Sequence, residues 1–284
     1  MDHLATAPPE VRAIVDELRR GITSALGTNL VGLYLTGSLT YGDFDPGSSD
    51  IDYLAVLRRP LAPPERDALA DLHREIGEQY PAWRERIEGS YVTASMLLSV
   101  EPPAEPRPYV NGGTFWDPEP RYGNEWLINR YALQECGIAL AGPAFSDLVP
   151  PVSVTDVRAA SARDLVEEWL LQLDDPAFLP DSHHQAYVTL TMCRILHRHA
   201  NDEVVSKRQA AAWARDRLEP RLQDLIDAAL AWQHGDLLDH RDDVREFVAL
   251  TGHLLSAPEW SKAAGQADGT GRQANELPGE DNAR

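Results

Sequence analysis

Residues 33–57 read LYLTGSLTYGDFDPGSSDIDYLAVL, and the rest of the chain is organised around this stretch. Two apolar runs flank a segment that is rich in Gly, Asp and Pro. Apolar runs of this length, bounded by turn-forming residues, predict two β-strands joined by a loop. The first strand leads into Gly37 and Ser38, and the second opens with Asp50 and Asp52.

The aspartates are spaced so that they can share a ligand. Side chains alternate between the two faces of a strand, so Asp50 and Asp52 point to the same side. Two carboxylates on one face repel each other unless a cation lies between them. Hard oxygen ligands of this kind suit Mg²⁺, which keeps some waters and takes further ligands from substrate phosphates. The pair therefore predicts a magnesium site.

The loop between the strands supplies groups that suit a phosphate. Gly37 lets the backbone approach closely, and the N–H and hydroxyl of Ser38 can then donate to the ligand. Ser49 adds another hydroxyl. An Asp-x-Asp pair on its own is usually a solvated strand end or turn. The complete order is far more specific: Gly-Ser, a spacer that holds Gly42, Ser-Asp-Ile-Asp and then an apolar run. It favours a joint phosphate and metal site.

This order of residues resembles the signature of the nucleotidyltransferase superfamily. Within it, the chain is most similar to the aminoglycoside adenylyltransferases of the streptomycin and spectinomycin resistance type, over residues 10–257. The resemblance implies an α+β fold: a polymerase-beta-like mixed sheet with helices, followed by an all-helical domain. It also implies ATP and Mg²⁺, transfer of AMP to an antibiotic hydroxyl, release of pyrophosphate, and antibiotic resistance.

Composition and charge limit the class of substrate. The chain has 284 residues, 43% of them hydrophobic, with a formal net charge of −19. It can hold one large domain or two ordinary ones, each with a packed core. Proteins that bind nucleic acid gain affinity from basic side chains, and no basic run is present here. The charge favours a small cationic substrate, although it would also serve solubility alone.

From other features of the sequence we expect a cytoplasmic protein. There is no apolar run near the roughly 18 residues that a membrane span needs, and no N-terminal signal pattern. Cys136 and Cys193 lack metal-ligand spacing, which fits a reducing compartment. The nine histidines show no zinc spacing, and we expect His197 and His199 at the surface. We expect a monomer that contacts neither membrane nor nucleic acid.

Periodicity predicts a sheet-containing domain over residues 1–150 and a helical domain over 151–257. Residues 258–284 hold almost nothing apolar to bury, and we expect them to be disordered. The expected strands cover 30–35, 50–57 and 86–97, and the expected helices cover 10–26, 65–80, 124–136, 154–173, 185–200, 206–218 and 236–255.

Glu88 lies near the start of the expected third strand. The resemblance implies that it is the catalytic base, which takes the proton from the attacking hydroxyl of the acceptor, and that it adds to the metal ligands. A carboxylate close to two others should have a raised pKa, which suits a base near neutral pH. The alternative is a surface glutamate on an edge strand.

Two more residues of the first domain are assigned by resemblance. Glu125 falls where the family has an acid near the nucleotide. Trp116 falls near the position of an aromatic side chain that stacks on the aminoglycoside, once a few inserted residues are allowed. A tryptophan in a loop is otherwise a core residue.

Two basic residues of the helical half match phosphate-binding residues of the family. Arg194 shares a helix face with apolar neighbours, a poor place for a charge unless an anion meets it. Lys207 follows Ser206, a predicted N-cap, at the positive end of its helix. A structural salt bridge is the alternative for each. The family's third phosphate contact is a tyrosine, and Gln233 stands there instead.

The acceptor is the least determined part. The drug-binding acids of the family should precede the core helix, where residues 178–185 read FLPDSHHQ. Asp181 is a substrate-contact candidate if the register of the alignment is shifted, and His183 or His184 is the alternative at this place. The alternatives are transfer to another cationic metabolite or to a protein hydroxyl, and a nucleotide sensor without transfer. An intact acid triad disfavours the sensor, because buried like charges without a metal are costly.

Overall fold

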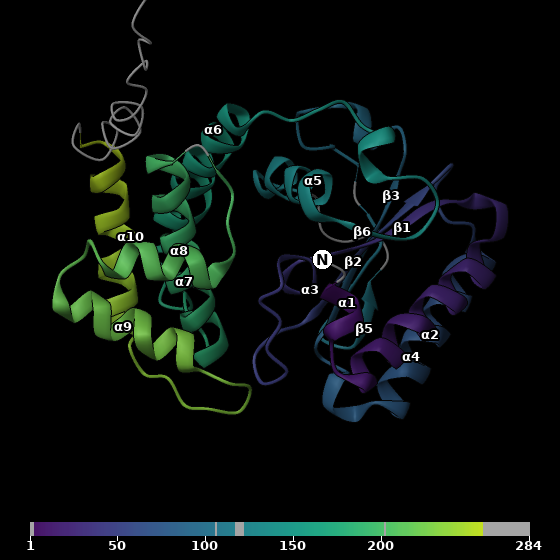
Figure 1. The fold of residues 1–284 in the computed structure, drawn as a ribbon, viewed down its shortest axis with the longest axis horizontal. Coiled ribbons are helices and arrows are strands. Elements are labelled where there is room, and N and C mark those ends of the chain that lie inside the picture. The colour runs from purple at the N-terminus through teal and green to yellow at the C-terminus, as the bar shows by residue number, and fades with distance from the viewer. Residues whose placement is uncertain (1–2, 106, 117–121, 202, 258–284) are drawn as a thin grey trace, which may run out of the picture.

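The computed structural model describes residues 3–105, 107–116, 122–201 and 203–257. Figure 1 shows two parts side by side, a sheet with flanking helices and a group of packed helices. The fold predicted for both halves, α+β and then all-helical, is confirmed. The domain boundary at residue 150 stays a prediction, and the expected disorder of 258–284 falls outside the described residues.

The described residues form a mixed sheet with strand order β5-β4-β3-β2-β1-β6. Neighbouring strands are antiparallel except for β2 and β3, which run parallel. The first three strands match the predicted ones to within a few residues. The strands are β1 (Leu30–Thr36), β2 (Ile51–Leu57), β3 (Ile87–Thr93), β4 (Tyr109–Asn111), β5 (Thr114–Trp116) and β6 (Ile138–Ala141).

Helices cover both faces of this sheet, as strand alternation requires. Helices α2 (Pro9–Leu26) and α4 (Pro63–Gln79) pack on the face that carries Leu35 and Tyr53. Helix α5 (Glu125–Cys136) packs on the opposite face. The second residue of β2, Asp52, lies on the same face as Leu54 and Val56, so it points toward the α5 side. Short helical segments are α1 (His3–Thr6), α3 (Ser38–Tyr41), Gly27–Asn29, Pro81–Trp83, Met96–Leu98 and Phe145–Asp147.

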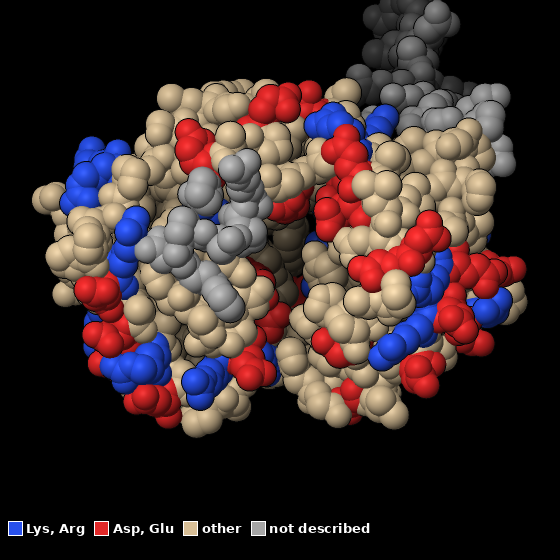
Figure 2. Space-filling model, turned by 180° about the vertical axis from the view of Figure 1, so that it is seen from behind, with Lys and Arg blue, Asp and Glu red and all other residues tan. Residues whose placement is uncertain are grey.

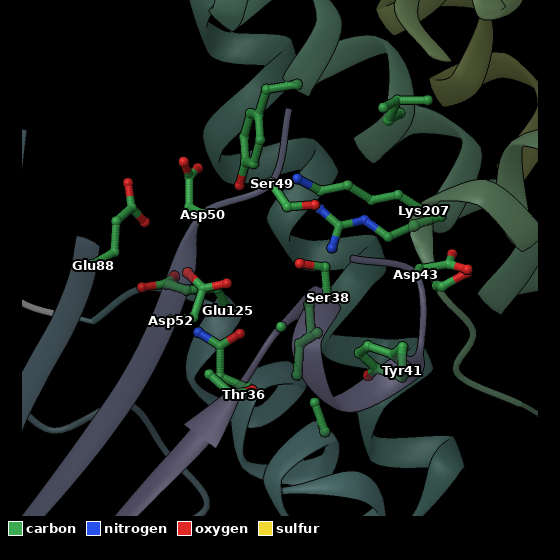
Figure 3. A pocket seen from close by; sticks show the side chains of 18 of the residues that line it. Thr36, Ser38, Tyr41, Asp43, Ser49, Asp50, Asp52, Glu88, Glu125 and Lys207 are labelled. Carbon is green, nitrogen blue, oxygen red and sulfur yellow. The ribbon is translucent and has the colours of Figure 1, made fainter. Parts of the chain in front are cut away.

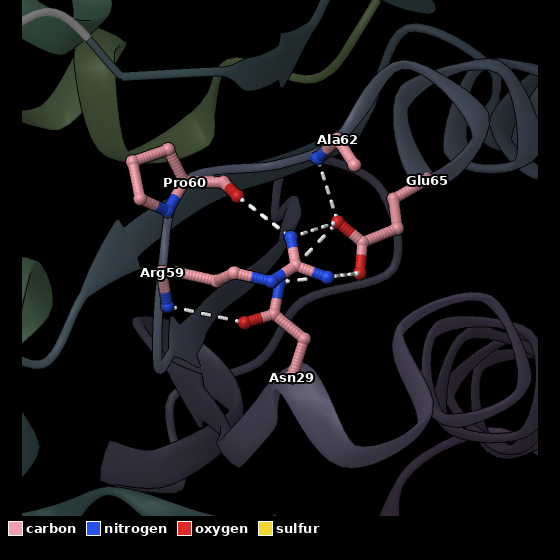
Figure 4. A network of polar contacts seen from close by, with 5 residues as sticks. All are labelled: Asn29, Arg59, Pro60, Ala62 and Glu65. Atoms are coloured by element: carbon pink, nitrogen blue, oxygen red, sulfur yellow. Dashed lines mark hydrogen bonds and ion pairs between the residues drawn. The ribbon is translucent and has the colours of Figure 1, made fainter.

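A polar network fixes α4 to the ends of β1 and β2 (Figure 4). The Glu65 carboxylate accepts a hydrogen bond from the Ala62 N–H at 2.7 Å, in the first turn of α4. It also receives the Arg59 guanidinium at 2.9 and 3.0 Å and the Asn29 amide at 3.3 Å. Asn29 precedes β1 and Arg59 follows β2, so one carboxylate joins three segments of the domain.

The helical domain is built around α7, whose side chains are mostly buried. Its core joins α7 to α8, α9 and α10 through Leu, Ile, Val, Met and Phe side chains. The helices are α6 (Val154–Asp164), a π-helical turn (Leu165–Trp169), a short turn (Leu170–Gln172), α7 (Ser182–Ala200), α8 (Lys207–Arg215), α9 (Pro220–Ala231) and α10 (Arg241–Leu255).

Several elements differ from the sequence prediction. The helix expected over 154–173 changes to π-helical geometry at Leu165. Helix α7 begins three residues earlier than expected, because the Asp181 side chain accepts from the His184 N–H at 2.8 Å and caps it. The surface position expected for His197 is wrong: it is 4% exposed and lies against Trp213. Helix α9 and strands β4, β5 and β6 were not predicted.

Among the described residues, no helix combines the length and the apolar character that a membrane span requires.

Candidate active site

Three carboxylates meet where β2 and β3 lie parallel. Asp52 and Glu88 are direct partners in the strand register, so their side chains stand next to each other on one face. Asp50 immediately precedes β2. Figure 3 shows Asp50, Asp52 and Glu88 pointing into the same space. The sequence-predicted acids are therefore brought together, and Glu88 lies on an inner strand rather than at the sheet edge.

Burial and mutual repulsion shape the protonation of this cluster. Burial raises the pKa of Asp52 to about 7, and Asp50 adds to the shift while Lys207 and Arg194 oppose it. Burial raises the pKa of Glu88 to about 8, with a further rise from Asp52 and Asp50. The cluster thus holds protons near neutral pH and would release them to a cation that takes their place.

The donor set fits a hard divalent cation. Oδ1 of Asp50 is buried and accepts no hydrogen bond within the described part of the chain. Two basic groups approach it only at ion-pair distance: Arg86 Nε at 3.6 Å and His234 Nε2 at 3.5 Å. A buried carboxylate oxygen that lacks a short donor, beside two further carboxylates, is what Mg²⁺ with oxygen ligands requires.

Arg86 and His234 were not predicted from the sequence. Arg86 lies over the Trp83 ring, 4.1 Å from its centroid, and also donates to the Ser49 carbonyl. It therefore fixes the segment that leads into β2. His234 comes from the helical domain, between α9 and α10. Burial lowers its pKa, with Asp50 opposing, so the imidazole is neutral at pH 7.

The turn after β1 leaves room for a ligand. Gly37 has φ 68°, a conformation that favours glycine. A β-carbon here would lie 2.0 Å from Asp52 Oδ2, so any side chain would strike the carboxylate. Ser38 begins α3, and its buried hydroxyl has no partner among the described residues. The Ser49 hydroxyl accepts from the Asp45 N–H at 3.0 Å and keeps its own proton to donate.

The helical domain presents cations to this turn. Lys207 is the first residue of α8, and Ser206 caps that helix as predicted, accepting from the Gln209 N–H at 3.2 Å. Burial lowers the pKa of Lys207, and Arg194 lowers it further. Arg194 donates to Thr191 Oγ1 at 3.1 Å, while its buried Nε has no partner in the described chain. Figure 3 shows Lys207 across the space from Asp50 and Asp52.

Both domains line one cavity of about 570 Å³, a size typical of small-molecule sites. Figure 2 shows the groove between the two halves, with acidic side chains along both sides of it. Glu125 lines the cavity and accepts from the Gly123 N–H at 3.0 Å. Aromatic side chains supply much of the remaining wall, among them Tyr109, Tyr122 and Trp232.

The predicted substrate contacts Asp181 and His184 do not line the cavity. Trp116 ends β5, and its side chain lies outside the described part of the structure. Asp181 and His184 lie at the start of α7, and both side chains are more than half exposed, at 57% and 54%. They are not among the cavity-lining residues, whereas His183 between them is, with its ring stacked on Trp232 at 5.4 Å between centroids.

The loop that carries Ser49 and Asp50 is also held by the helical domain. Arg208 at the start of α8 forms an ion pair with Asp45 at 2.8 Å. The His234 N–H donates to the Gly47 carbonyl at 3.0 Å. A β-carbon at Gly47 would lie 2.7 Å from the Gln233 side chain. Gln233 therefore packs on this loop.

Comparison with known proteins fits this geometry. Residues 15–95 match the nucleotidyltransferase domain family, which covers β1 to β3 and the three carboxylates. The fold and site thus define a nucleotidyltransferase. Residues 147–256 match the C-terminal domain of aminoglycoside adenylyltransferases. The chain belongs to the aminoglycoside adenylyltransferase family and is an enzyme.

Characterised relatives span nearly the whole chain. A spectinomycin 9-adenylyltransferase of Staphylococcus aureus is 25% identical over 84% of this chain and 92% of its own length. An aminoglycoside (3'') (9) adenylyltransferase of Escherichia coli is 26% identical over the same shares. The crystal structure of spectinomycin adenyltransferase AAD(9) from Enterococcus faecialis with ATP and spectinomycin has the same fold. Its TM-score is 0.68 at 18% identity, over 87% of this chain and 99% of that one.

Proposed function

We propose that this enzyme transfers AMP from ATP to a hydroxyl of a cationic antibiotic of the streptomycin and spectinomycin class and releases pyrophosphate. One observation carries the proposal: Asp50, Asp52 and Glu88 face Arg194 and Lys207 across a single cavity between the domains. The names of the relatives agree with it, because they describe adenylyl transfer to spectinomycin and to aminoglycosides.

The phosphates of the nucleotide would be contacted from both walls of the cavity. Gly37 and Ser38 let the backbone and a hydroxyl reach the phosphates, and Arg194 and Lys207 neutralise them from the opposite side. Asp50 and Asp52, with Glu88 beside them, would hold Mg²⁺. When bound, the ion would neutralise charge on the phosphate at the reacting end.

Glu88 is the proposed base. Once a cation has displaced the protons of the cluster, the Glu88 carboxylate is free to take the proton that the acceptor hydroxyl gives up as it attacks, and its burial favours that uptake. The acceptor oxygen then forms a bond to the α-phosphorus of ATP. The bond from that phosphorus to the bridging oxygen breaks, and its electron pair leaves with pyrophosphate. Asp52 holds the neighbouring position in the strand register, and its charge adds to the raised pKa of Glu88.

The cavity walls favour a cationic acceptor. Glu88, Glu125 and Asp43 line it together with Asp50 and Asp52. This gathering of carboxylates in a partly desolvated groove attracts positive charge and repels anionic acceptors. Tyr and Trp side chains on the same walls offer apolar faces to a ring-shaped molecule.

The decisive experiment measures pyrophosphate release by the purified protein with Mg-ATP and either streptomycin or spectinomycin, together with the product mass. We expect pyrophosphate release that depends on one of these acceptors, and a product heavier by one AMP. Pyrophosphate release with another amine-bearing metabolite or with a protein hydroxyl, and not with these antibiotics, would show that the acceptor belongs to another class. ATP binding without release under any of these conditions would favour a nucleotide sensor and overturn the proposal.

A further inference from the structure

Arg198 is a buried cation that the proposed chemistry has not yet used. It is 6% exposed and lies four residues after Arg194 on α7, on the same face of the helix. Within the described residues its side chain makes one hydrogen bond, a long one from Nη1 to the Ser161 hydroxyl at 3.4 Å. Its Nε is buried without a partner in the described chain. Yet Arg198 lines the same cavity as Arg194 and Lys207.

The cost of this arrangement indicates a missing anion. Burial lowers the pKa of Arg198 to about 9, and the neighbouring Arg194 lowers it further. The Asp164 carboxylate raises the pKa of Arg198, but no ion pair within 4.0 Å joins the two among the described residues. Burying a guanidinium without a paired carboxylate costs folding free energy, unless an anionic ligand pairs with it.

Three donors that lack partners in the described part of the chain line the cavity, one from the sheet side and two from α7. Ser38 Oγ, Arg194 Nε and Arg198 Nε all lack partners within the described residues, and all three residues line the cavity. The start of α7 lies close to Asp50, because the His183 ring is 5.6 Å from the His234 ring, and His234 Nε2 is 3.5 Å from Asp50 Oδ1. Arg198 therefore lies farther from this end of the helix than Arg194, by about 6 Å.

From these positions we infer that Arg198, with Arg194, forms a subsite for the terminal phosphate of the nucleoside triphosphate and for the pyrophosphate that leaves. This inference rests on the proposed function, because it assigns the far end of the nucleotide whose near end meets Asp52 and Glu88. The subsite takes a di- or triphosphate chain, not AMP.

The subsite adds a specific step to the reaction. As the bond between the α-phosphorus and its bridging oxygen breaks, negative charge builds on the leaving pyrophosphate. The Arg198 guanidinium donates to the far phosphate and stabilises that charge. Tyr41 lines the same cavity, and burial raises the pKa of its hydroxyl, which therefore stays neutral and adds no negative charge.

The test uses inorganic pyrophosphate as the probe, with calorimetric titration of the whole chain. Arg198→Met should weaken pyrophosphate binding about 10-fold or more and leave AMP binding unchanged. Its melting temperature should stay the same or rise, because an uncompensated buried charge has been removed. Arg217→Met, the same change at an exposed residue outside the cavity, should bind pyrophosphate as the wild type does.

Two results would overturn the inference: wild-type pyrophosphate affinity in Arg198→Met, or no pyrophosphate binding by the wild type. If Arg198→Met is unstable, Arg198→Lys decides, because lysine keeps the charge and loses the planar fork. A stable Arg198→Lys with weakened pyrophosphate binding supports the subsite, and one with unchanged binding removes it. Failure here is separable from failure of the proposed function. Acceptor-dependent AMP transfer by the wild type would stand even if Arg198 proved irrelevant to pyrophosphate.

Discussion

The two walls of the cavity carry opposite charges and are positioned in different ways. On the sheet side, strand register sets the carboxylates, with Asp52 and Glu88 paired across β2 and β3. On the helical side, Arg194 and Lys207 come from α7 and α8, whose position depends on helix packing. A sheet register is held by a ladder of hydrogen bonds, whereas packed helices can shift as a body. We therefore expect the acidic wall to control the chemical step and the basic wall to control nucleotide binding.

The largest effect should follow from neutralising the acidic wall. Asp52→Asn should lower the rate of AMP transfer by at least about 10,000-fold, because a ligand of the cation is lost where charge must be neutralised. The fold should persist, since a buried like-charge contact is relieved. Pyrophosphate release and melting temperature measure the two effects. The exposed Asp16→Asn is the matched control, and substantial turnover by Asp52→Asn would remove the metal-site assignment.

Removal of the base alone separates binding from chemistry within the acidic wall. Glu88→Gln should lower transfer about 100-fold to 1,000-fold, because no group then takes the hydroxyl proton. ATP affinity, measured by titration calorimetry, should stay within a factor of about 3 of wild type, since Glu88 is assigned to the proton rather than the phosphates. Unchanged turnover in this variant would exclude Glu88 as the base.

Substitution in the basic wall should weaken nucleotide binding more than it slows the chemical step. Lys207→Met should raise the KM for ATP about 10-fold to 100-fold and lower kcat much less, because a charge-assisted contact to the phosphates is lost. Steady-state kinetics at saturating acceptor distinguish the two constants. If kcat falls as steeply as in Glu88→Gln while KM stays the same, the division of labour between the walls is wrong.

The smallest effect concerns the back of the acidic wall. His73 hydrogen-bonds to the Tyr53 and Tyr91 hydroxyls at 2.9 Å, behind β2 and β3. Burial lowers the pKa of His73 from 6.5 to about 3. Below pH 6.5 the unfolded chain therefore binds a proton that the folded chain excludes, so stability falls as the pH falls from 6.5 toward 3. The loss from His73 should be about 2 kcal/mol between pH 7 and pH 5.

Urea unfolding at pH 7 and pH 5 measures this loss in the free energy of unfolding. His73→Gln should lose the corresponding part of the pH dependence, whereas the exposed His253→Gln should keep it. An equal pH slope in wild type and His73→Gln would show that the buried imidazole does not titrate as the structure indicates. Turnover at pH 7 should be unaffected in either variant.

The sequence reveals the acidic wall more readily than the basic one. Asp50, Asp52 and Ser38 lie within one short stretch, so their spacing alone predicts a shared site. The role of Glu88 could be predicted only from the family resemblance, because its approach to Asp52 depends on a strand register that sequence spacing does not reveal. Arg194 gave a signal of its own, since a charge on an apolar helix face is unusual.

Other parts could not be read from the chain, for different reasons. Arg86 and His234 reach Asp50 only through tertiary structure, and neither has a local pattern that marks it. Strands β4 and β5 have three residues each, too few for a periodicity to show. Helix α9 did carry an apolar signal that was available: Leu222, Leu225, Ile226 and Ala229 recur at helical spacing and are buried.

The loop that ends at Asp50 is fastened to the opposite domain, through Arg208 on Asp45 and the His234 N–H on Gly47. Any swing of the helices wide enough to let a bulky product escape must either undo both fastenings or drag the loop outward. If the loop follows the helices, Asp50 moves away from Asp52, and the acid cluster has to be reassembled before the next turnover. Release of the product would then be coupled to the geometry of the catalytic centre.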